Sequence, residues 1–221
     1  MFYLRQLIDF LLKRGFENIV IIDNKSTYPP LLAYYKEIED QVNVEFMKEN
    51  AGHMVFFKNK DLQKKYGKGY FVLNDADIVP NENLPVDFMS VMLNYLDRYF
   101  RAINKVGFAL RIDDIPDYFP FKEKVLEWEE KYWKNKISDN LFKADIDTTF
   151  ALYKPNYPTR FNNVYFYRGL RISDSFNSSH GGWYKNPYKL SEEDKFYQKT
   201  ANSSGSWNFD KNNRLKGDIN Y

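Results

Sequence analysis

The chain has 221 residues, of which 43% are hydrophobic and 19% aromatic, a globular composition that argues against disorder of the whole chain. Lysine and arginine (32) nearly balance aspartate and glutamate (30), and no long basic run stands out, so a dedicated nucleic-acid binder is not indicated. The absence of cysteine excludes disulfides, thiolate zinc sites and cysteine nucleophiles.

The first half of the chain alternates helix-like and strand-like segments. Apolar residues at helical spacing predict helices over residues 4–12, 29–40, a stretch that ends near Gly67, and 85–100. Short apolar runs predict strands over residues 18–24, 42–47, 70–78 and 106–113. This alternation with short connections predicts an α/β fold with a largely parallel sheet.

The second half has a different pattern. Residues 121–133 predict an amphipathic helix, residues 144–153 and 163–172 predict strands that could be antiparallel, and residues 177–187 predict a loop. From Ser191 the chain becomes polar, which is typical of a docked extension, a linker or a frayed tail. We expect one domain over residues 1–190 and a polar extension or linker over 191–221.

No apolar run approaches the roughly 20 residues of a membrane span, and the N-terminus lacks the apolar region of a signal peptide. We therefore expect a soluble, cytoplasmic protein without a transmembrane segment.

Two acids follow a buried-looking strand in the stretch YFVLNDADIVP (residues 70–80). In an extended segment, residues two apart point to the same side, so Asp75 and Asp77 can converge on one point. Two carboxylates suit Mg²⁺ or Mn²⁺ held jointly with substrate phosphates. The alternative is a capped turn before Pro80, where aspartate is common.

Five stretches together resemble a known family. VIIDNKST (20–27), ENAGH (49–53), YFVLNDADIVP, ADIDTTFALY (144–153) and RISDSFNSSHGGWY (171–184) occur in the order found in nucleotide-sugar glycosyltransferases of the GT-A fold. The resemblance is to family 2-like enzymes of surface polysaccharide synthesis and to short enzymes of large algal viruses, and it covers roughly residues 2–187. It implies a single α/β domain with a mixed, Rossmann-like sheet flanked by helices.

Such enzymes normally begin with a strand before the first helix, and here a helix follows Met1 almost at once. We expect this first strand to be missing from the sheet, which would leave a hydrophobic seam and alter the pocket for the nucleotide base.

The resemblance implies a divalent metal site, occupied by Mn²⁺ or Mg²⁺. Asp75 and Asp77 would be metal ligands, with Asp77 the more direct one, and His180 in SHGGWY would complete the site. The alternative for His180 is a surface loop histidine. The resemblance also implies a donor site made of Asp23, Asn24, Asn50, Gly52, Asn74, Asp75, Arg168 and Arg171. The alternatives for these residues are a helix cap around Asp23 and a solvated strand face for the two arginines.

An acceptor hydroxyl needs a base in an inverting enzyme. By position, Asp147 is the first candidate for this base and Asp145 the second, while Asp113 and Asp114 compete because they also follow a strand. Trp183 and Tyr184 could stack on an acceptor sugar. The alternatives are a structural acid at Asp147 and ordinary packing of the two aromatic side chains.

The resemblance therefore implies a metal-dependent hexosyltransferase that moves a hexose from a UDP-sugar, glucose-type or related, to a glycan or glycoprotein acceptor with inversion. Two other readings stay open. One is a retaining transferase. The other is a non-catalytic module that binds nucleotide sugars or glycans within a larger protein, with further domains on its C-terminal side.

Overall fold

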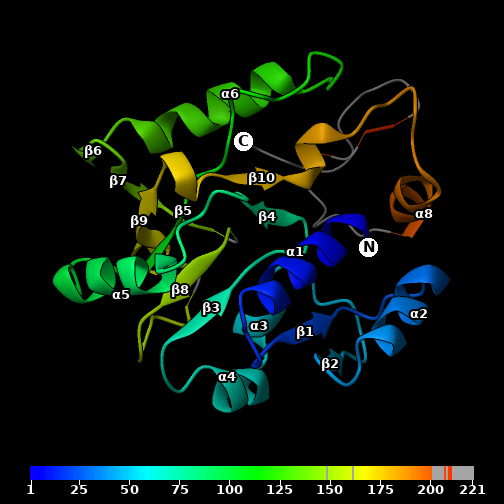
Figure 1. Cartoon of the computed structure of the whole chain (residues 1–221), viewed down its shortest axis with the longest axis horizontal. Coiled ribbons are helices and arrows are strands. Elements are labelled where there is room, and N and C mark those ends of the chain that lie inside the picture. Colours follow the sequence, from blue (N-terminus) through cyan, green and yellow to red (C-terminus); the bar gives the residue numbers. More distant parts are fainter. Residues whose placement is uncertain (148, 161, 201–206, 208, 211–221) are drawn as a thin grey trace.

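Three separate groups of strands build the sheet structure in the computed structural model, which describes residues 1–147, 149–160, 162–200, 207, 209 and 210 (Figure 1). The parallel pair consists of β1 (Val20–Asp23) and β2 (Asn43–Phe46), and the antiparallel pair consists of β4 (Ile78–Pro80) and β10 (Ser178–His180). The main sheet has the order β3 (Phe71–Leu73), β8 (Ala151–Tyr153), β5 (Lys105–Phe108), β9 (Arg168–Ile172), β7 (Leu141–Asp145) and β6 (Lys136–Ser138).

The main sheet is mixed, and the prediction of a largely parallel sheet is wrong. Only β5 and β9 run parallel within it, whereas β8 runs antiparallel to both of its neighbours and β7 to both of its own. The cause lies in the second half of the chain, where β6 and β7 are joined by a tight turn and β7 and β8 by a short bend instead of crossover helices. The α/β class with a mixed sheet flanked by helices is confirmed.

The helices follow the predicted periodicity closely in the first half. They are α1 (Phe2–Lys13), α2 (Pro29–Glu37), α3 (Val55–Lys58), α4 (Lys60–Tyr66), α5 (Phe88–Arg98), α6 (Lys122–Glu130), α7 (Val164–Tyr167) and α8 (Glu192–Thr200). Three 3₁₀ turns accompany them: η1 (Lys131–Trp133), η2 (Asp174–Phe176) and η3 (Gly181–Tyr184).

One predicted helix is divided in two. The side chain of Asn59 accepts hydrogen bonds from the backbone N–H groups of Asp61 and Leu62, at 2.9 and 3.1 Å, and so begins α4 as a new helix after α3. Gly67 follows the last residue of α4, as the sequence predicts.

Four strand predictions are wrong in their extent. The stretch 70–78 divides into β3 and β4, which belong to different sheets, and 144–153 divides into the end of β7 and β8. The stretch 163–172 begins as the short helix α7 and becomes strand only at Arg168, and 106–113 is strand only as far as Phe108. The turn at Asp75, formed by a hydrogen bond that spacing does not reveal, interrupts the first of these runs.

The buried core of the described residues is divided into three clusters. One cluster fills the space under α5 and α6, a second lies around α3 and β8, and a third joins α1 to α2. In the described residues, β1 pairs only with β2, and β3 pairs only with β8. The apolar side chains of β1 and β3 line one shared cavity. Helix α1 packs against β4 and lies between β4 and the β1–β2 pair in the view of Figure 1.

None of the helices among the described residues has the length and apolar character needed to cross a membrane.

Candidate active site

One large cavity of about 2030 Å³ collects most of the predicted site residues. Its wall includes the end of β1, the turn after β3, the segment after β10, part of α6 and the bend after β7. The predicted site residues in this wall are Asp23, Asn24, Asn50, Gly52, Asn74, Asp75, Asp77, Asp147, Arg171, His180, Trp183 and Tyr184. Two predicted site residues, Asp145 and Arg168, do not line it.

Asp75 and Asp77 lie in a tight turn and not in an extended strand. The backbone N–H of Ile78 donates to the carbonyl of Asp75 at 3.1 Å, and the side-chain amide of Asn74 donates to the carbonyl of Ile78 at 3.0 Å. The argument that an extended backbone aligns the two acids is therefore wrong. The turn, the alternative given above, presents both acids to the cavity.

Pairing of β4 with β10 brings His180 to this turn. His180 lies opposite Ile78 in the antiparallel register, and the backbone N–H of Gly181 donates to the carbonyl of Asp77 at 2.7 Å. As a result, Nδ1 of His180 lies 3.6 Å from Oδ2 of Asp77, although the two residues are far apart in sequence.

The His180 ring is held by one stacking contact and one hydrogen bond. Trp183 stacks on it, with ring centroids 4.7 Å apart and planes at 5°, and the backbone N–H of Gly182 donates to Nδ1 at 3.1 Å. A side chain on Gly182 would meet the ring at 2.9 Å, so glycine is needed for this approach. Nδ1 has one lone pair and the N–H of Gly182 donates to it, so His180 would bind an ion through this atom only by exchanging that hydrogen bond for a metal bond, beside the Asp77 carboxylate.

These donors fit one divalent ion. Ligand bonds to an ion such as Mg²⁺ are about 2.1 Å long, so one ion can contact two atoms up to about 4.2 Å apart. Within the described ranges, no group of three or more histidine and acidic side chains could hold a metal, so Asp75 does not complete a three-ligand site with Asp77 and His180. Asp77 and His180 would hold the ion together with oxygen atoms from a ligand, which is the arrangement that Mg²⁺ adopts with phosphates.

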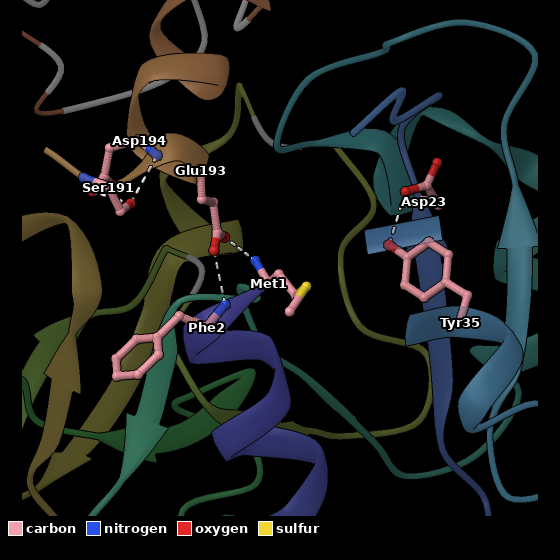
Figure 2. A network of polar contacts seen from close by, with 7 residues as sticks. All are labelled: Met1, Phe2, Asp23, Tyr35, Ser191, Glu193 and Asp194. Atoms are coloured by element: carbon pink, nitrogen blue, oxygen red, sulfur yellow. Dashed lines mark hydrogen bonds and ion pairs between the residues drawn. The ribbon is translucent and has the colours of Figure 1, made fainter. Parts of the chain in front are cut away.

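The polar residues at the end of β1 are bonded mainly to one another. Asp23 is 3% exposed, and its carboxylate accepts from the hydroxyl of Tyr35 at 2.9 Å (Figure 2). It also accepts from the backbone N–H of Ser26 at 2.8 Å. Burial, the charge of Asp23 and this hydrogen bond together raise the pKa of Tyr35 well above its ordinary value. Asp23 thus has a local structural role of the kind given above as the alternative.

Asn24 ties β1 to the loop that precedes α3. Its amide donates to the carbonyl of Gly52 at 2.8 Å and its Oδ1 accepts from the N–H of Ala51 at 3.3 Å, while Asn50 Oδ1 accepts from the N–H of Gly52 at 3.0 Å. Gly52 has φ +78°, a conformation that favours glycine. The structure therefore brings the predicted donor residues Asn24, Asn50 and Gly52 together.

The two predicted donor arginines differ in burial. Arg168 is exposed and lies over the ring of Tyr165, 4.2 Å from its centroid. Arg171 is 4% exposed, forms an ion pair with the buried Glu129 at 2.9 Å, and lies over the ring of Tyr132 at 3.9 Å. Its contacts are therefore internal, and they join β9 to α6.

The turn after β7, residues 145–147, is anchored at several points. Ile146 is fully buried, and its side chain fills a slot where side chains on Gly107 and Gly169 would meet it at 3.1 and 2.7 Å. Arg171 Nε donates to the carbonyl of Asp145 at 3.0 Å, and the Tyr153 hydroxyl lies 3.5 Å from the carbonyl of Asp147. With the turn fixed in this way, Asp147 is exposed to the cavity, whereas Asp145 is exposed outside it.

Trp183 and Tyr184 have internal partners too. Trp183 is 1% exposed, which leaves no free ring face for a sugar, and the Tyr184 hydroxyl donates to Asp114 at 2.6 Å. Asp114 also pairs with Arg111 at 2.6 Å, and neither Asp113 nor Asp114 lines the cavity.

The polar extension begins with a helix that lies at the cavity. The side chain of Glu193 in α8 forms an ion pair with the Met1 amino group and accepts from the N–H of Phe2 at 3.1 Å (Figure 2). The ring of Phe196 packs on Tyr28 with centroids 5.0 Å apart. The beginning of the predicted extension is therefore docked on α1, and residues 201–206, 208 and 211–221 lie outside the described residues.

Sequence reasoning missed several residues of this site. The cavity wall also contains Tyr3, Trp128, Glu129, Tyr132 and Thr149, and Lys105 lies buried behind it. One signal was present for Lys105, because a lysine heads the otherwise apolar stretch KVGFAL. Glu129 gave no signal, since it lies among other charged residues on an amphipathic helix.

No known protein family and no curated protein matches this sequence. Among solved structures, the chain is similar to the mannosyltransferase PcManGT from Pyrobaculum calidifontis in complex with GDP-Man and Mn²⁺, with 13% identity and a TM-score of 0.49. The alignment covers 89% of this chain and 56% of that one, so the chain spans little more than half of that enzyme's length. At this similarity, the likeness carries no argument about what the present chain binds.

Proposed function

We propose that the chain is a metal-dependent glycosyltransferase that moves a hexose from a UDP-sugar to a glycan or glycoprotein acceptor. The observation that carries this proposal is the convergence of Asp77 and His180, 3.6 Å apart, on the cavity that also exposes Asp147. A nucleotide diphosphate would supply the oxygen ligands that the described protein residues lack.

The chemistry requires two groups near the anomeric carbon of the transferred sugar, one for the leaving diphosphate and one for the incoming acceptor hydroxyl. When bound, the metal ion would neutralise charge that develops on the diphosphate leaving group. In an inverting transfer, Asp147 takes the proton of the acceptor hydroxyl while the acceptor oxygen forms a bond to the anomeric carbon. The bond from that carbon to the diphosphate breaks, and its electron pair leaves with UDP.

The negative charges of Asp147 and Asp75 both affect the buried hydroxyl of Tyr153. Burial raises the pKa of Tyr153 well above its ordinary value, and the negative charges of Asp147 and then Asp75 raise it further. Asp75 and Asp147 line the same cavity, as a transfer between donor and acceptor needs.

Calorimetric titration with UDP, UDP-glucose and GDP-mannose, each with and without Mn²⁺, tests the proposal. We expect Mn²⁺-dependent binding of a UDP ligand that is lost in Asp77→Ala and kept in Asp139→Ala, since Asp139 is a fully exposed acid paired with Lys136 on the surface. Binding of UDP-glucose that needs neither the metal nor Asp77 would instead favour a non-catalytic binding module.

A further inference from the structure

Two buried cations converge on the turn of residues 145–147. In the part of the chain that the structure describes, Lys105 and Arg171 are the buried basic residues, with exposed fractions of 0% and 4%. Arg171 donates to the carbonyl of Asp145. Lys105 Nζ lies 3.1 Å from the hydroxyl of Tyr153, and this hydroxyl lies 3.5 Å from the carbonyl of Asp147.

The two cations differ in how their charge is balanced. Arg171 has a buried carboxylate partner, Glu129. Lys105 forms no ion pair with any described carboxylate, and its ammonium group instead faces aromatic rings, 4.3 Å from the centroid of Phe166 and 4.7 Å from that of Tyr153. A buried lysine without a carboxylate partner costs stability in its charged form, so its presence in the core calls for a role beyond stability.

The charged and titratable groups around Lys105 point to that role. Burial lowers the pKa of Lys105 to about 7, the charges of Asp147 and then Asp145 oppose this shift, and the charge of Arg171 adds to it. The hydroxyl groups of Tyr153 and Tyr167 complete the set; burial raises the pKa of both, and the charge of Asp147 raises it further. Asp147 is therefore the acid most strongly coupled to Lys105.

We propose that Lys105 is a positioning residue for Asp147, and that its buried side-chain nitrogen, by donating to the Tyr153 hydroxyl, fixes the turn that presents the Asp147 carboxylate to the cavity. The proposal rests on the proposed function, in which Asp147 acts as the base. Lys105 itself does not line the cavity and touches no substrate.

Lys105→Met is the decisive variant, because methionine keeps the length of the side chain and removes the charge. Lys154→Met is the matched control, since Lys154 is the residue after Tyr153 but binds the carbonyl of Phe100 at 2.7 Å on the surface. The measurements are thermal stability, Mn²⁺-dependent affinity for UDP-glucose, and the rate of UDP release from that donor.

We expect Lys105→Met to be at least as stable as the unchanged protein, to bind the donor within twofold, and to release UDP about tenfold to a hundredfold more slowly. Lys154→Met should match the unchanged protein in donor affinity and rate. UDP release within twofold of the unchanged protein in Lys105→Met overturns the proposal, as does a loss of rate that only follows a loss of folded protein.

A second measurement separates this proposal from the proposed function. The titration of the Lys105 side chain is followed by NMR of labelled lysine in the unchanged protein, in Asp147→Asn and in Asp139→Asn. We expect the Lys105 pKa to fall by about half a unit or more in Asp147→Asn only, because the variant removes a nearby negative charge. If the protein releases no UDP from any donor, the proposed function fails and this titration alone decides whether the two residues are coupled; equal titrations in all three proteins overturn the proposal.

Discussion

Two acidic turns of this molecule share the spacing Asp-x-Asp and differ in everything that surrounds them. The turn at Asp75 and Asp77 has a small alanine in the middle, and Nδ1 of His180 lies 3.6 Å from the carboxylate of Asp77. The turn at Asp145 and Asp147 has a buried isoleucine in the middle and two buried cations behind it.

The difference in surroundings suits the same Asp-x-Asp spacing to two different roles. The first turn gathers electron donors without a permanent positive charge, so it is suited to a metal ion that arrives with a ligand. The second turn already has internal positive charge and rigid anchors, so it is suited to hold one carboxylate in a fixed place without a metal. The following changes should each affect one turn and spare the other.

Removing Glu129 should have the largest effect. Glu129→Ala leaves Arg171 as an unpaired charge in the core, which should lower the free energy of unfolding by about 3 to 5 kcal/mol. Glu130→Ala is the control, because its pair with Lys134 is exposed, and it should change stability by less than about 1 kcal/mol. Urea denaturation measures both. Equal losses in the two variants would contradict a structural role for the buried pair.

Gly169→Ala should disturb only the second turn. The added methyl group would lie 2.7 Å from Ile146 Cδ1 and 3.1 Å from the carbonyl oxygen of Lys105, so Ile146 must move and the neighbouring Asp147 with it. We expect a loss of about 2 kcal/mol in stability and a slower UDP release, with unchanged Mn²⁺-dependent donor affinity. Gly69→Ala, where a side chain meets nothing within 4 Å, should be neutral. A changed donor affinity in Gly169→Ala would show that the two turns are not independent.

The pH dependence of stability should report on Lys105. Its pKa is about 7 in the folded protein and 10.5 in its ordinary state, so between pH 7 and 9 the unfolded chain binds more protons. Stability from this group therefore rises with pH, by up to about 1.4 kcal/mol for each unit. Lys105→Met should lack this rise, and Lys154→Met should keep it. Denaturant midpoints at pH 7, 8 and 9 measure the slopes, and parallel slopes in Lys105→Met and the unchanged protein would contradict a lowered pKa.

Gly182→Ala should disturb only the first turn, and by the smallest amount. The methyl group would lie 2.9 Å from Cε1 of His180 and displace its ring from Asp77. We expect Mn²⁺-dependent donor affinity to fall about tenfold, as is typical for a disturbed metal ligand, and stability to change little. Calorimetry with UDP-glucose and thermal unfolding measure the two quantities. Unchanged affinity would remove His180 from the metal site.

The sequence predicts those parts of the molecule that depend on local pattern. Leu4, Leu7 and Ile8 repeat at helical spacing and lie buried in α1, and the apolar runs at 20–23 and 43–46 become β1 and β2. His180 was placed near Asp77 by resemblance in motif order, and the structure brings the two within 3.6 Å.

The parts that could not be predicted depend on partners far away in sequence. The apolar run at 70–80 does not reveal that a hydrogen bond from Ile78 to Asp75 turns the chain from one sheet into another. Glu129 and Arg171 are 42 residues apart, and Lys105 and Tyr153 are 48 apart, so neither contact leaves a local pattern. Arg171 therefore resembled a ligand-binding arginine, although its contacts are internal.

The central claim is that Asp77 and His180 hold a divalent ion together with a nucleotide diphosphate, and pulsed EPR of Mn²⁺ with UDP tests it most directly. The chain has two histidines, so His53→Gln is the natural control for His180→Gln. We predict nitrogen and phosphorus couplings to the same Mn²⁺ ion, with the nitrogen coupling lost in His180→Gln and kept in His53→Gln. Identical spectra in the unchanged protein and His180→Gln, with only water and phosphate around the ion, would contradict the claim.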